Sequence, residues 1–267
     1  MFRRIKSAIA SPADIVGGVA YELGLKTSVE TAHGGKLWAD TYSELKTARN
    51  LALSQLELAL IEVIPDQGIV FDIGAHIGIW TVPMALRRPK ATIYAFEGAT
   101  ATHARLAKNV TANGIANADV HHLAVSDNVG SVTFQSPHNA SVFGRIAAVG
   151  NSRGRYDNAV TVEVPCTTVA DFCSRNRISH IDFIKIDVEG AELNVLRGAL
   201  PLLAERKIEK IWMEVEPDNQ KDFGSSVEAL AGLIESVGYA AYRISAPNTP
   251  VNLVREHDNN MILKPLA

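Results

Sequence analysis

The sequence predicts an α/β protein in which a mostly parallel sheet of about seven strands follows an N-terminal helical extension. Short apolar runs typical of buried strands alternate along the chain with helical patterns, as they do in βαβ units. The first of these runs in the main domain leads through a glycine-containing turn into a helix. With 47% hydrophobic and 21% charged residues, the 267-residue chain also has enough apolar material for a large core.

The N-terminal extension is expected to span residues 1–64, and the main domain residues 65–267. Paired glycines in residues 1–40 indicate a short irregular arm, to which we assign no chemistry. From Ser43 onward, apolar residues recur near the 3.6-residue spacing of a helix that ends at Pro65. No run of about 18 uncharged apolar residues occurs, so the sequence predicts no membrane-spanning helix.

The main domain is predicted to begin with alternating strands and helices. In chain order these are the strand 69–73, a helix from about residue 78, the strand 92–96, a helix over about 102–113 and the strand 120–125. Two alternating runs, 131–135 and 160–164, then flank a polar stretch, which predicts a hairpin-like insertion with a long loop. The parallel pattern resumes with the strand 181–188, a leucine-striped helix, the strand 208–215, a helix opened by the capping box Ser225–Glu228, and terminal strands 239–244 and 260–263.

The glycine turn after the strand 69–73 has the architecture of a nucleotide site. It contains Gly74, Ala75, His76 and Gly78, and Glu97 ends the next strand nineteen residues after Gly78. An acid at that place can accept hydrogen bonds from both hydroxyls of an adenosine ribose. The combination of turn and acid therefore predicts a cofactor that contains adenosine.

Physical detail distinguishes between two such cofactors. The spacing Gly74-x-x-x-Gly78 differs from the G-x-G-x-x-G of dinucleotide sites, whose extra glycine lets the backbone close on a pyrophosphate. Asp72 lies at the tip of the strand, where its carboxylate would repel a pyrophosphate but would suit a ligand that carries an ammonium and a sulfonium. S-adenosylmethionine therefore fits better than NAD, and an NAD-linked oxidoreductase is the alternative enzyme.

Three blocks of the chain resemble the FkbM family of S-adenosylmethionine-dependent methyltransferases. These blocks are residues 70–81, residues 95–97 with 106–109 and 113–114, and residues 181–193, of which the last is the most specific. The resemblance covers roughly residues 65–245 and implies a Rossmann-like class I methyltransferase fold. It also implies methylation of a hydroxyl on a sugar, glycan or secondary metabolite. The alternative outside the enzymes is a methyltransferase-like binding protein that has no catalytic activity.

The resemblance also implies roles for individual residues. Asp72 and Gly74 would hold the methionine portion of the cofactor, Glu97 its ribose, and the loop Ser126–Asp127 its adenine. The chain departs from the family pattern at His76, where asparagine is common. This departure removes no charged contact with the cofactor.

Acidic residues gather where the fourth and fifth parallel strands are predicted to end. Lys185 and Asp187 lie on one face of the fourth strand, Glu189 continues that face, and Glu214 ends the fifth strand. Open α/β sheets bind ligands at this carboxyl edge. Asp187 or Glu189 is the predicted base for the attacking hydroxyl, and Lys185 is interpreted as a structural counter-charge. Asp187 and Glu214 as ligands of a divalent metal form an alternative, which we do not favour because no third ligand can be named.

Charge and cysteine content limit the partners and the compartment. Lys and Arg number 26 against 29 Asp and Glu, a net charge of −3, so no overall positive field attracts nucleic acid. Cys166 and Cys173 match neither a redox CxxC motif nor a zinc framework, which favours a reducing, cytoplasmic compartment. The expected partner is a small-molecule or glycan acceptor, and the sequence predicts no particular oligomeric state.

Overall fold

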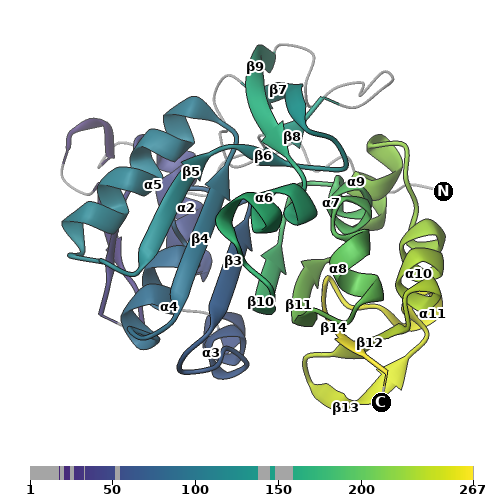
Figure 1. Ribbon diagram of the computed structural model, residues 1–267. Helices are drawn as coiled ribbons and strands as arrows, with labels where there is room; N and C mark the ends of the chain where they lie inside the picture. The colour runs from purple at the N-terminus through teal and green to yellow at the C-terminus, as the bar shows by residue number, and fades with distance from the viewer. Residues whose placement is uncertain are drawn as a thin grey trace, which may run out of the picture.

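The computed structural model describes residues 18, 21–24, 27–32, 34–51, 55–137, 145–147 and 159–266. In this part of the chain, helices cover both faces of an eight-stranded sheet, and a smaller four-stranded sheet stands at one end of it (Figure 1). The predicted α/β class and the mostly parallel sheet are confirmed. No helix among these residues is long and apolar enough to cross a membrane.

The large sheet has its antiparallel strands on one side. In spatial order its strands are β13 (Ala246–Val251), β12 (Tyr239–Arg243), β14 (Asn260–Pro265), β11 (Ile208–Glu214), β10 (Ile181–Ile186), β3 (Ile69–Ile73), β4 (Thr92–Glu97) and β5 (Ala118–His122). The strands from β11 to β5 are parallel, whereas β14 runs antiparallel to β11 and β12, and β13 forms an antiparallel edge. The sequence did not indicate β13 because Pro247 and Pro250 interrupt it, and sheets confine proline to edge strands of this kind.

Helices pack on both faces of the parallel strands and bury them. The helices are α2 (Tyr42–Leu51), α3 (Gln55–Glu62), α4 (Thr81–Arg87), α5 (Thr100–Ala112), α6 (Val169–Asn176), α7 (Glu192–Gly198), α8 (Leu200–Ala204), α9 (Pro217–Asp222), α10 (Val227–Ser236) and α11 (Leu253–Glu256). Neighbouring residues of β3 show how the faces divide. Phe71 lies in one core with side chains of α6, α7 and α10, and Val70 lies in another with side chains of α2, α3 and α4.

The N-terminal extension contains a hairpin as well as helices. β1 (Ser28–Glu30) pairs antiparallel with β2 (Lys36–Trp38). The helix predicted from Ser43 corresponds to α2 and α3, which lie on either side of residues 52–54, outside the described residues. Leu45 of α2 and Leu60 of α3 belong to the same core as side chains of α4 and the large sheet. The extension is therefore packed directly on the main domain.

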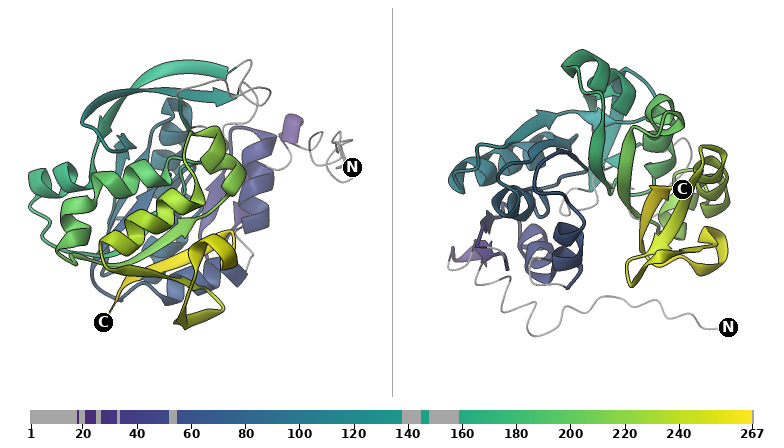
Figure 2. Two further views of the ribbon diagram at one scale, coloured as in Figure 1. Left: turned by 90° about the vertical axis from the view of Figure 1, so that its right-hand side faces the viewer. Right: turned by 60° about the horizontal axis from the view of Figure 1, so that its bottom comes forward.

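The predicted strand 120–125 divides at Leu123 between two sheets. The second sheet consists, in spatial order, of β6 (Ala124–Val125), β9 (Ala159–Thr167), β7 (Gly130–Pro137) and β8 (Arg145–Ile146). β7 and β9 pair antiparallel and contain the two runs predicted to form a hairpin-like insertion, which is confirmed. Figures 1 and 2 show this small sheet beyond the end of the large sheet at which β5 leads into β6.

The order of the strands reverses between β3 and β10. From β3 the chain continues outward to β4 and β5, whereas β11 follows β10 on the other side. The two central strands are parallel, and Lys185 lies opposite Asp72 in their register. Open α/β sheets bind ligands outside the carboxyl ends of the strands at such a reversal. The fold thus predicts a ligand site beyond Ile73 and Ile186.

Candidate functional site

A cavity of about 230 Å³ lies beyond the carboxyl ends of β3, β4, β10 and β11. Its ionisable side chains come from the ends of these strands or from the turns that follow them. They are His76, Glu97, Lys185, Asp187, Glu189 and Glu214. Apolar side chains border it from other elements, among them Leu51 of α2, Trp80 before α4 and Phe134 of β7. Segments far apart in the sequence therefore meet around one cavity.

Glu97 ends β4 and is held by two backbone groups. One carboxylate oxygen accepts a hydrogen bond from the backbone N of His76 at 2.9 Å, and the other accepts one from Ala99 N at 2.8 Å. Only 7% of Glu97 is exposed. Burial raises its pKa to about 7, although the two backbone donors and Lys185 act to lower it. Each carboxylate oxygen has a further lone pair with which to accept a ligand hydroxyl.

His76 lies in the turn after β3 with φ 53°, in the left-handed region. Asparagine and histidine are both enriched in this conformation, which explains why histidine fits a place where the family commonly has asparagine. Both ring nitrogens are buried without a hydrogen-bond partner in the described part of the chain, and the residue lines the cavity. Burial lowers its pKa to about 4, so at neutral pH the ring offers one donor and one acceptor.

Lys185 is a buried cation between two aspartates. Its Nζ lies 3.2 Å from an Asp187 oxygen, 3.6 Å from an Asp72 oxygen and 3.3 Å from the carbonyl oxygen of Gly74. Burial alone would lower its pKa, but the two carboxylates outweigh this effect and raise the pKa above its usual value. Lys185 is therefore the counter-charge of Asp72 as well as of Asp187.

Asp72 is fully buried and is not among the residues that line the cavity. One of its oxygens accepts a hydrogen bond from Thr81 Oγ1 at 2.6 Å, and the other faces Lys185. Burial raises its pKa, although Lys185 and Thr81 oppose this effect. Direct contact of Asp72 with a methionine portion stays a prediction, which this placement does not favour because Lys185 lies opposite Asp72 in register and balances its charge. Asp187, whose side chain is 36% exposed, borders the cavity instead.

The structure brings the three carboxylates predicted for catalysis together. Asp187, Glu189 and Glu214 all line the cavity beside Lys185. Glu189 has φ 55° in the turn after β10, and it accepts a hydrogen bond from Asn219 Nδ2 at 2.9 Å. Burial, followed by the charges of Asp187 and Glu189, raises the pKa of Glu214 to about 9. At neutral pH Glu214 therefore holds a proton close to two other carboxyl groups.

Glu192 holds the turn that carries these carboxylates, a role that sequence reasoning missed. In the sequence it looks like an ordinary first-turn acid of α7, favoured by the helix dipole. It is only 1% exposed, and its Oε1 accepts hydrogen bonds from Val188 N and Gly190 N at 3.2 Å each. Gln220 Nε2 donates to its other oxygen. Its place two residues after a glycine turn is the signal that points to this role, since an acid there reaches preceding N–H groups.

Gly74, Ala75 and Gly78 shape the turn after β3 through their backbone. A Cβ atom at Gly74, where φ is 79°, would lie 1.9 Å from the carbonyl oxygen of Asp187. A Cβ atom at Gly78 would lie 3.0 Å from Leu106 of α5. Ala75 is fully buried, and its N donates to the backbone of β4 at 3.0 Å. The glycine spacing therefore reflects contacts of this turn with other parts of the protein.

Ser126 and Asp127 lie outside the first cavity. They border a second cavity, between the small sheet and the helices α7 and α10. The chain leaves the large sheet just before them, and Ser126 N donates to Thr167 O at 2.9 Å. Leu123 and Val125 border the first cavity in their place. Contact of Ser126 and Asp127 with an adenine stays a prediction, which this placement does not favour.

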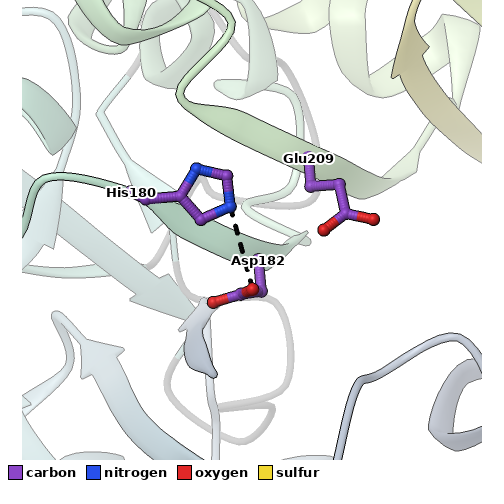
Figure 3. Close-up of side chains that lie close together, drawn as sticks. All are labelled: His180, Asp182 and Glu209. Carbon is purple, nitrogen blue, oxygen red and sulfur yellow. Dashed lines mark ion pairs between the residues drawn. The ribbon is translucent and has the colours of Figure 1, made fainter. Parts of the chain in front are cut away.

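A separate cluster of polar side chains lies where β10 and β11 begin (Figure 3). One atom each of His180, Asp182 and Glu209, of the kind that binds metals, lies within 4.8 Å of the others. One Asp182 oxygen accepts a hydrogen bond from Ile69 N at 2.7 Å, and the other lies 3.7 Å from His180 Nε2. Asp182 therefore joins β10 to the beginning of β3. The cluster shares no residue with the first cavity.

The fold and the first cavity define a Rossmann-like protein of the class I methyltransferase type, with a buried acid after β4 and carboxylates after β10 and β11. The chain belongs to the FkbM methyltransferase family, because the family profile of the methyltransferase FkbM domain matches residues 72–241. The expected family is thereby confirmed. The matched residues include the ionisable side chains of the cavity but not α2.

Relatives resemble this chain over part of their length. It is 28% identical over 147 residues to Methyltransferase 1 of Beauveria bassiana (strain ARSEF 2860), covering 50% of this chain and 59% of that protein. It is 28% identical over 153 residues to 31-O-demethyl-FK506 methyltransferase FkbM of Streptomyces tacrolimicus, covering 49% and 58%. It is 27% identical over 174 residues to 2-O-methyltransferase NoeI of Sinorhizobium fredii (strain NBRC 101917 / NGR234), covering 61% and 69%. The precorrin-6y C5,15-methyltransferase structure from Geobacter metallireducens GS-15 aligns with 12% identity and a TM-score of 0.42, covering 80% and 89%.

Proposed function

We propose that this protein is an S-adenosylmethionine-dependent methyltransferase that methylates a hydroxyl group of a sugar, glycan or secondary metabolite. The observation that carries the proposal is a single cavity, at the reversal between β3 and β10, in which Glu97 and three other carboxyl groups converge. Membership of the FkbM family supports methyl transfer. Relatives named as a 31-O-demethyl-FK506 methyltransferase and a 2-O-methyltransferase support oxygen as the acceptor atom.

The residues around the cavity fit S-adenosylmethionine. Glu97 would accept hydrogen bonds from the ribose hydroxyls, and the unpaired ring nitrogens of His76 can bond to polar groups of the ligand. Asp187 would face the ammonium of the methionine portion, while Asp72 would act through Lys185. The bound cofactor supplies a methyl group on a positively charged sulfur. A negative cavity therefore matches its charge.

Asp187 or Glu189 would be the base that accepts the proton of the hydroxyl, and both line the cavity. Asp187 is already paired with a buried cation, since Lys185 Nζ lies 3.2 Å from its carboxylate. Glu214 carries a proton at neutral pH and can donate a hydrogen bond that orients the hydroxyl or Glu189. The carboxyl groups thus suit the removal of one proton from the hydroxyl. The cavity would further lower the barrier to methyl transfer by aligning the reacting atoms.

Binding experiments test the cofactor. Isothermal titration with S-adenosylmethionine, S-adenosylhomocysteine and NAD should give binding of the first two and none of NAD. Binding of NAD alone would support the oxidoreductase alternative. Release of S-adenosylhomocysteine in the presence of hydroxylated acceptors separates an enzyme from a binding protein, which would bind the cofactor and release no product.

Chelation and substitution test the choice between base and metal. If Glu189 is the base, transfer persists in excess EDTA, and Glu189→Gln lowers turnover by about 10²–10⁴-fold with little change in cofactor affinity. If Asp187 and Glu214 bind a divalent metal, EDTA abolishes transfer, Mg²⁺ or Mn²⁺ restores it, and Asp187→Asn and Glu214→Gln are equally harmful. Full turnover of both Asp187→Asn and Glu189→Gln in EDTA would contradict the assignment of a catalytic carboxylate.

The compartment and the acceptor class belong to the same proposal. Cys166 and Cys173 are both free and buried, in keeping with a reducing compartment such as the cytoplasm. A small-molecule or glycan acceptor suits a cavity that combines carboxylates with apolar walls. Fractionation of the producing cells tests the compartment, because the proposal requires the protein to be recovered with cytoplasmic enzymes.

A further inference from the structure

Helix α2 supplies one wall of the cavity from outside the part of the chain that matches the family. Thr47 and Leu51 line the cavity and are four positions apart, so they lie on one face of the helix. Leu45 and Ala48, on a neighbouring face, are buried in the core. The helix is therefore held by one face and presents another to the cavity.

Asn109 of α5 and Asn113, the residue directly after α5, hold the strand β2 that precedes α2. Asn109 accepts a hydrogen bond from Trp38 N at 3.0 Å and donates one to Trp38 O at 2.9 Å. Asn113 makes the same pair of bonds with Lys36, at 2.8 Å and 2.7 Å. Asn109 also donates to Ile77 O at 2.8 Å. These bonds connect the extension with both α5 and the glycine turn after β3.

A capping box determines where α2 begins. Thr41 Oγ1 accepts a hydrogen bond from Glu44 N at 3.1 Å, and Glu44 Oε2 accepts bonds from Thr41 N at 3.2 Å and Asp40 N at 2.7 Å. Arg105 of α5 donates to both carboxylate oxygens of Asp40. These contacts fix the beginning of α2 and attach it to α5.

The wall formed by α2 borders the same cavity as the carboxylates Asp187, Glu189 and Glu214. Leu51 packs against the core cluster that contains Trp80, whose ring centre is 5.9 Å from Lys185 Nζ. Lys185 in turn contacts Asp187. The residues proposed to hold the cofactor come from β3, β4, β10 and the turns after them, whereas Thr47 and Leu51 come from α2. This separate origin makes Thr47 and Leu51 candidates for contact with the acceptor.

We propose that Thr47 and Leu51 contact the methyl acceptor and determine which acceptor is admitted. This inference rests on the proposed function and extends it to a segment outside the family match. One hydroxyl and one branched apolar side chain suit a neutral alcohol with an apolar face beside its reacting hydroxyl. In this proposal the carboxylates of the cavity hold the reacting hydroxyl, and Thr47 and Leu51 contact other atoms of the acceptor.

Chemical modification of Leu51→Cys tests where this wall lies. The native thiols are buried, which raises the pKa of Cys166 to about 11 and of Cys173 to about 12, so N-ethylmaleimide should modify the new cysteine alone. Asn50→Cys, at an exposed position of the same helix, is the matched control. We expect Leu51→Cys to react with and without saturating S-adenosylhomocysteine. The modified protein should bind S-adenosylhomocysteine within about threefold of the wild-type dissociation constant.

Protection of the cysteine at position 51 by S-adenosylhomocysteine, or a loss of affinity beyond about tenfold after modification, would overturn the inference. Either result would place α2 against the cofactor. Failure of wild-type protein to bind S-adenosylhomocysteine contradicts the proposed function itself and is recognised before any modification. These measurements give a result without a known acceptor.

A transfer assay then tests the contact with the acceptor. Methyl glycosides and macrolactone alcohols serve as the panel, and the member that the wild type methylates fastest is used. Modified Leu51→Cys should lose at least about tenfold in kcat/KM for it, whereas modified Asn50→Cys should retain wild-type transfer. Equal transfer by the two modified proteins would refute the contact. Absence of turnover with every neutral alcohol would refute the acceptor class.

Discussion

The carboxyl group of Glu97 makes cofactor binding depend on pH. Only the ionised form accepts hydrogen bonds with both oxygens, and burial raises its pKa to about 7. We expect the affinity for S-adenosylhomocysteine to rise about tenfold between pH 6 and pH 8, measured by isothermal titration. Glu97→Gln should bind weakly and without this dependence. Equal pH profiles of the two proteins would show that another group titrates.

The same group affects stability in the opposite direction. Because the pKa is raised from 4.5 to about 7 on folding, the folded protein binds the proton more tightly than the unfolded chain. The contribution of Glu97 to stability is full below about pH 4.5 and is lost as the pH rises to about 7.

Glu97→Ala should weaken cofactor binding by about 1.5–3 kcal/mol, the range for hydrogen bonds to a charged group, while the protein remains folded.

Gly74 tests whether the turn after β3 is required by the protein itself. Gly74→Ala combines a positive φ with a Cβ atom only 1.9 Å from the carbonyl oxygen of Asp187. We expect a lower melting temperature and loss of S-adenosylhomocysteine binding, because the turn that carries Asp187 must move. Gly114→Ala is the matched control, since Gly114 has φ 66° and an added Cβ atom there would meet no other atom within 4 Å. Gly114→Ala should lower the free energy of unfolding by about 1–2 kcal/mol through backbone strain and leave S-adenosylhomocysteine binding intact.

At the level of the elements, the beginning of α7 holds the turn that carries the proposed catalytic carboxylates. Glu192→Ala removes the acceptor of Val188 N and Gly190 N, and buried donors left unpaired cost about 1–3 kcal/mol each. We expect lower stability in chemical denaturation and a large loss of turnover, because Glu189 is then no longer held in place. Turnover is measured as release of S-adenosylhomocysteine.

Glu192→Gln distinguishes a structural role from a charge effect. The glutamine oxygen can accept from the same two N–H groups, and its amide can donate to the unpaired Oε1 of Gln220. This variant should recover most of the stability and turnover that Glu192→Ala loses. Equal losses in both variants would mean that the negative charge of Glu192 matters and that its hydrogen bonds to the turn do not.

At the level of the whole molecule, the extension and the main domain should unfold together. Asn109 is fully buried and bonds both Trp38 and Ile77, so Asn109→Ala should lower the free energy of unfolding by about 2–3 kcal/mol. Asn113→Ala removes a similar pair of bonds from a half-buried residue, where water replaces them, and should lower the free energy of unfolding by about 1 kcal/mol or less. Calorimetry should show one transition in both variants. Two separate transitions would show that the extension unfolds independently.

The order of the elements follows from local patterns. Apolar runs predicted β3, β4, β10 and β11 because a strand buried on both faces must be apolar, and that requirement is visible in a single segment. The edge strand β13 and the division of one strand at Leu123 were not predicted. The pairing of β13 and the division at Leu123 both depend on which distant strand is available for pairing. A local sequence pattern does not indicate that partner.

By itself, the sequence determined the fold class, the family and the acids around the site, because chain connectivity brings the ends of parallel strands to one edge. Only the tertiary structure decided what each acid does. It paired Asp72 with Lys185 away from the cavity, left Asp187 beside it, and buried Glu192 as the acceptor of two turn amides. It also brought α2 to the cavity wall through asparagines more than seventy residues away. Burial and charge pairing depend on neighbours in space, and these neighbours exist only after the chain has folded.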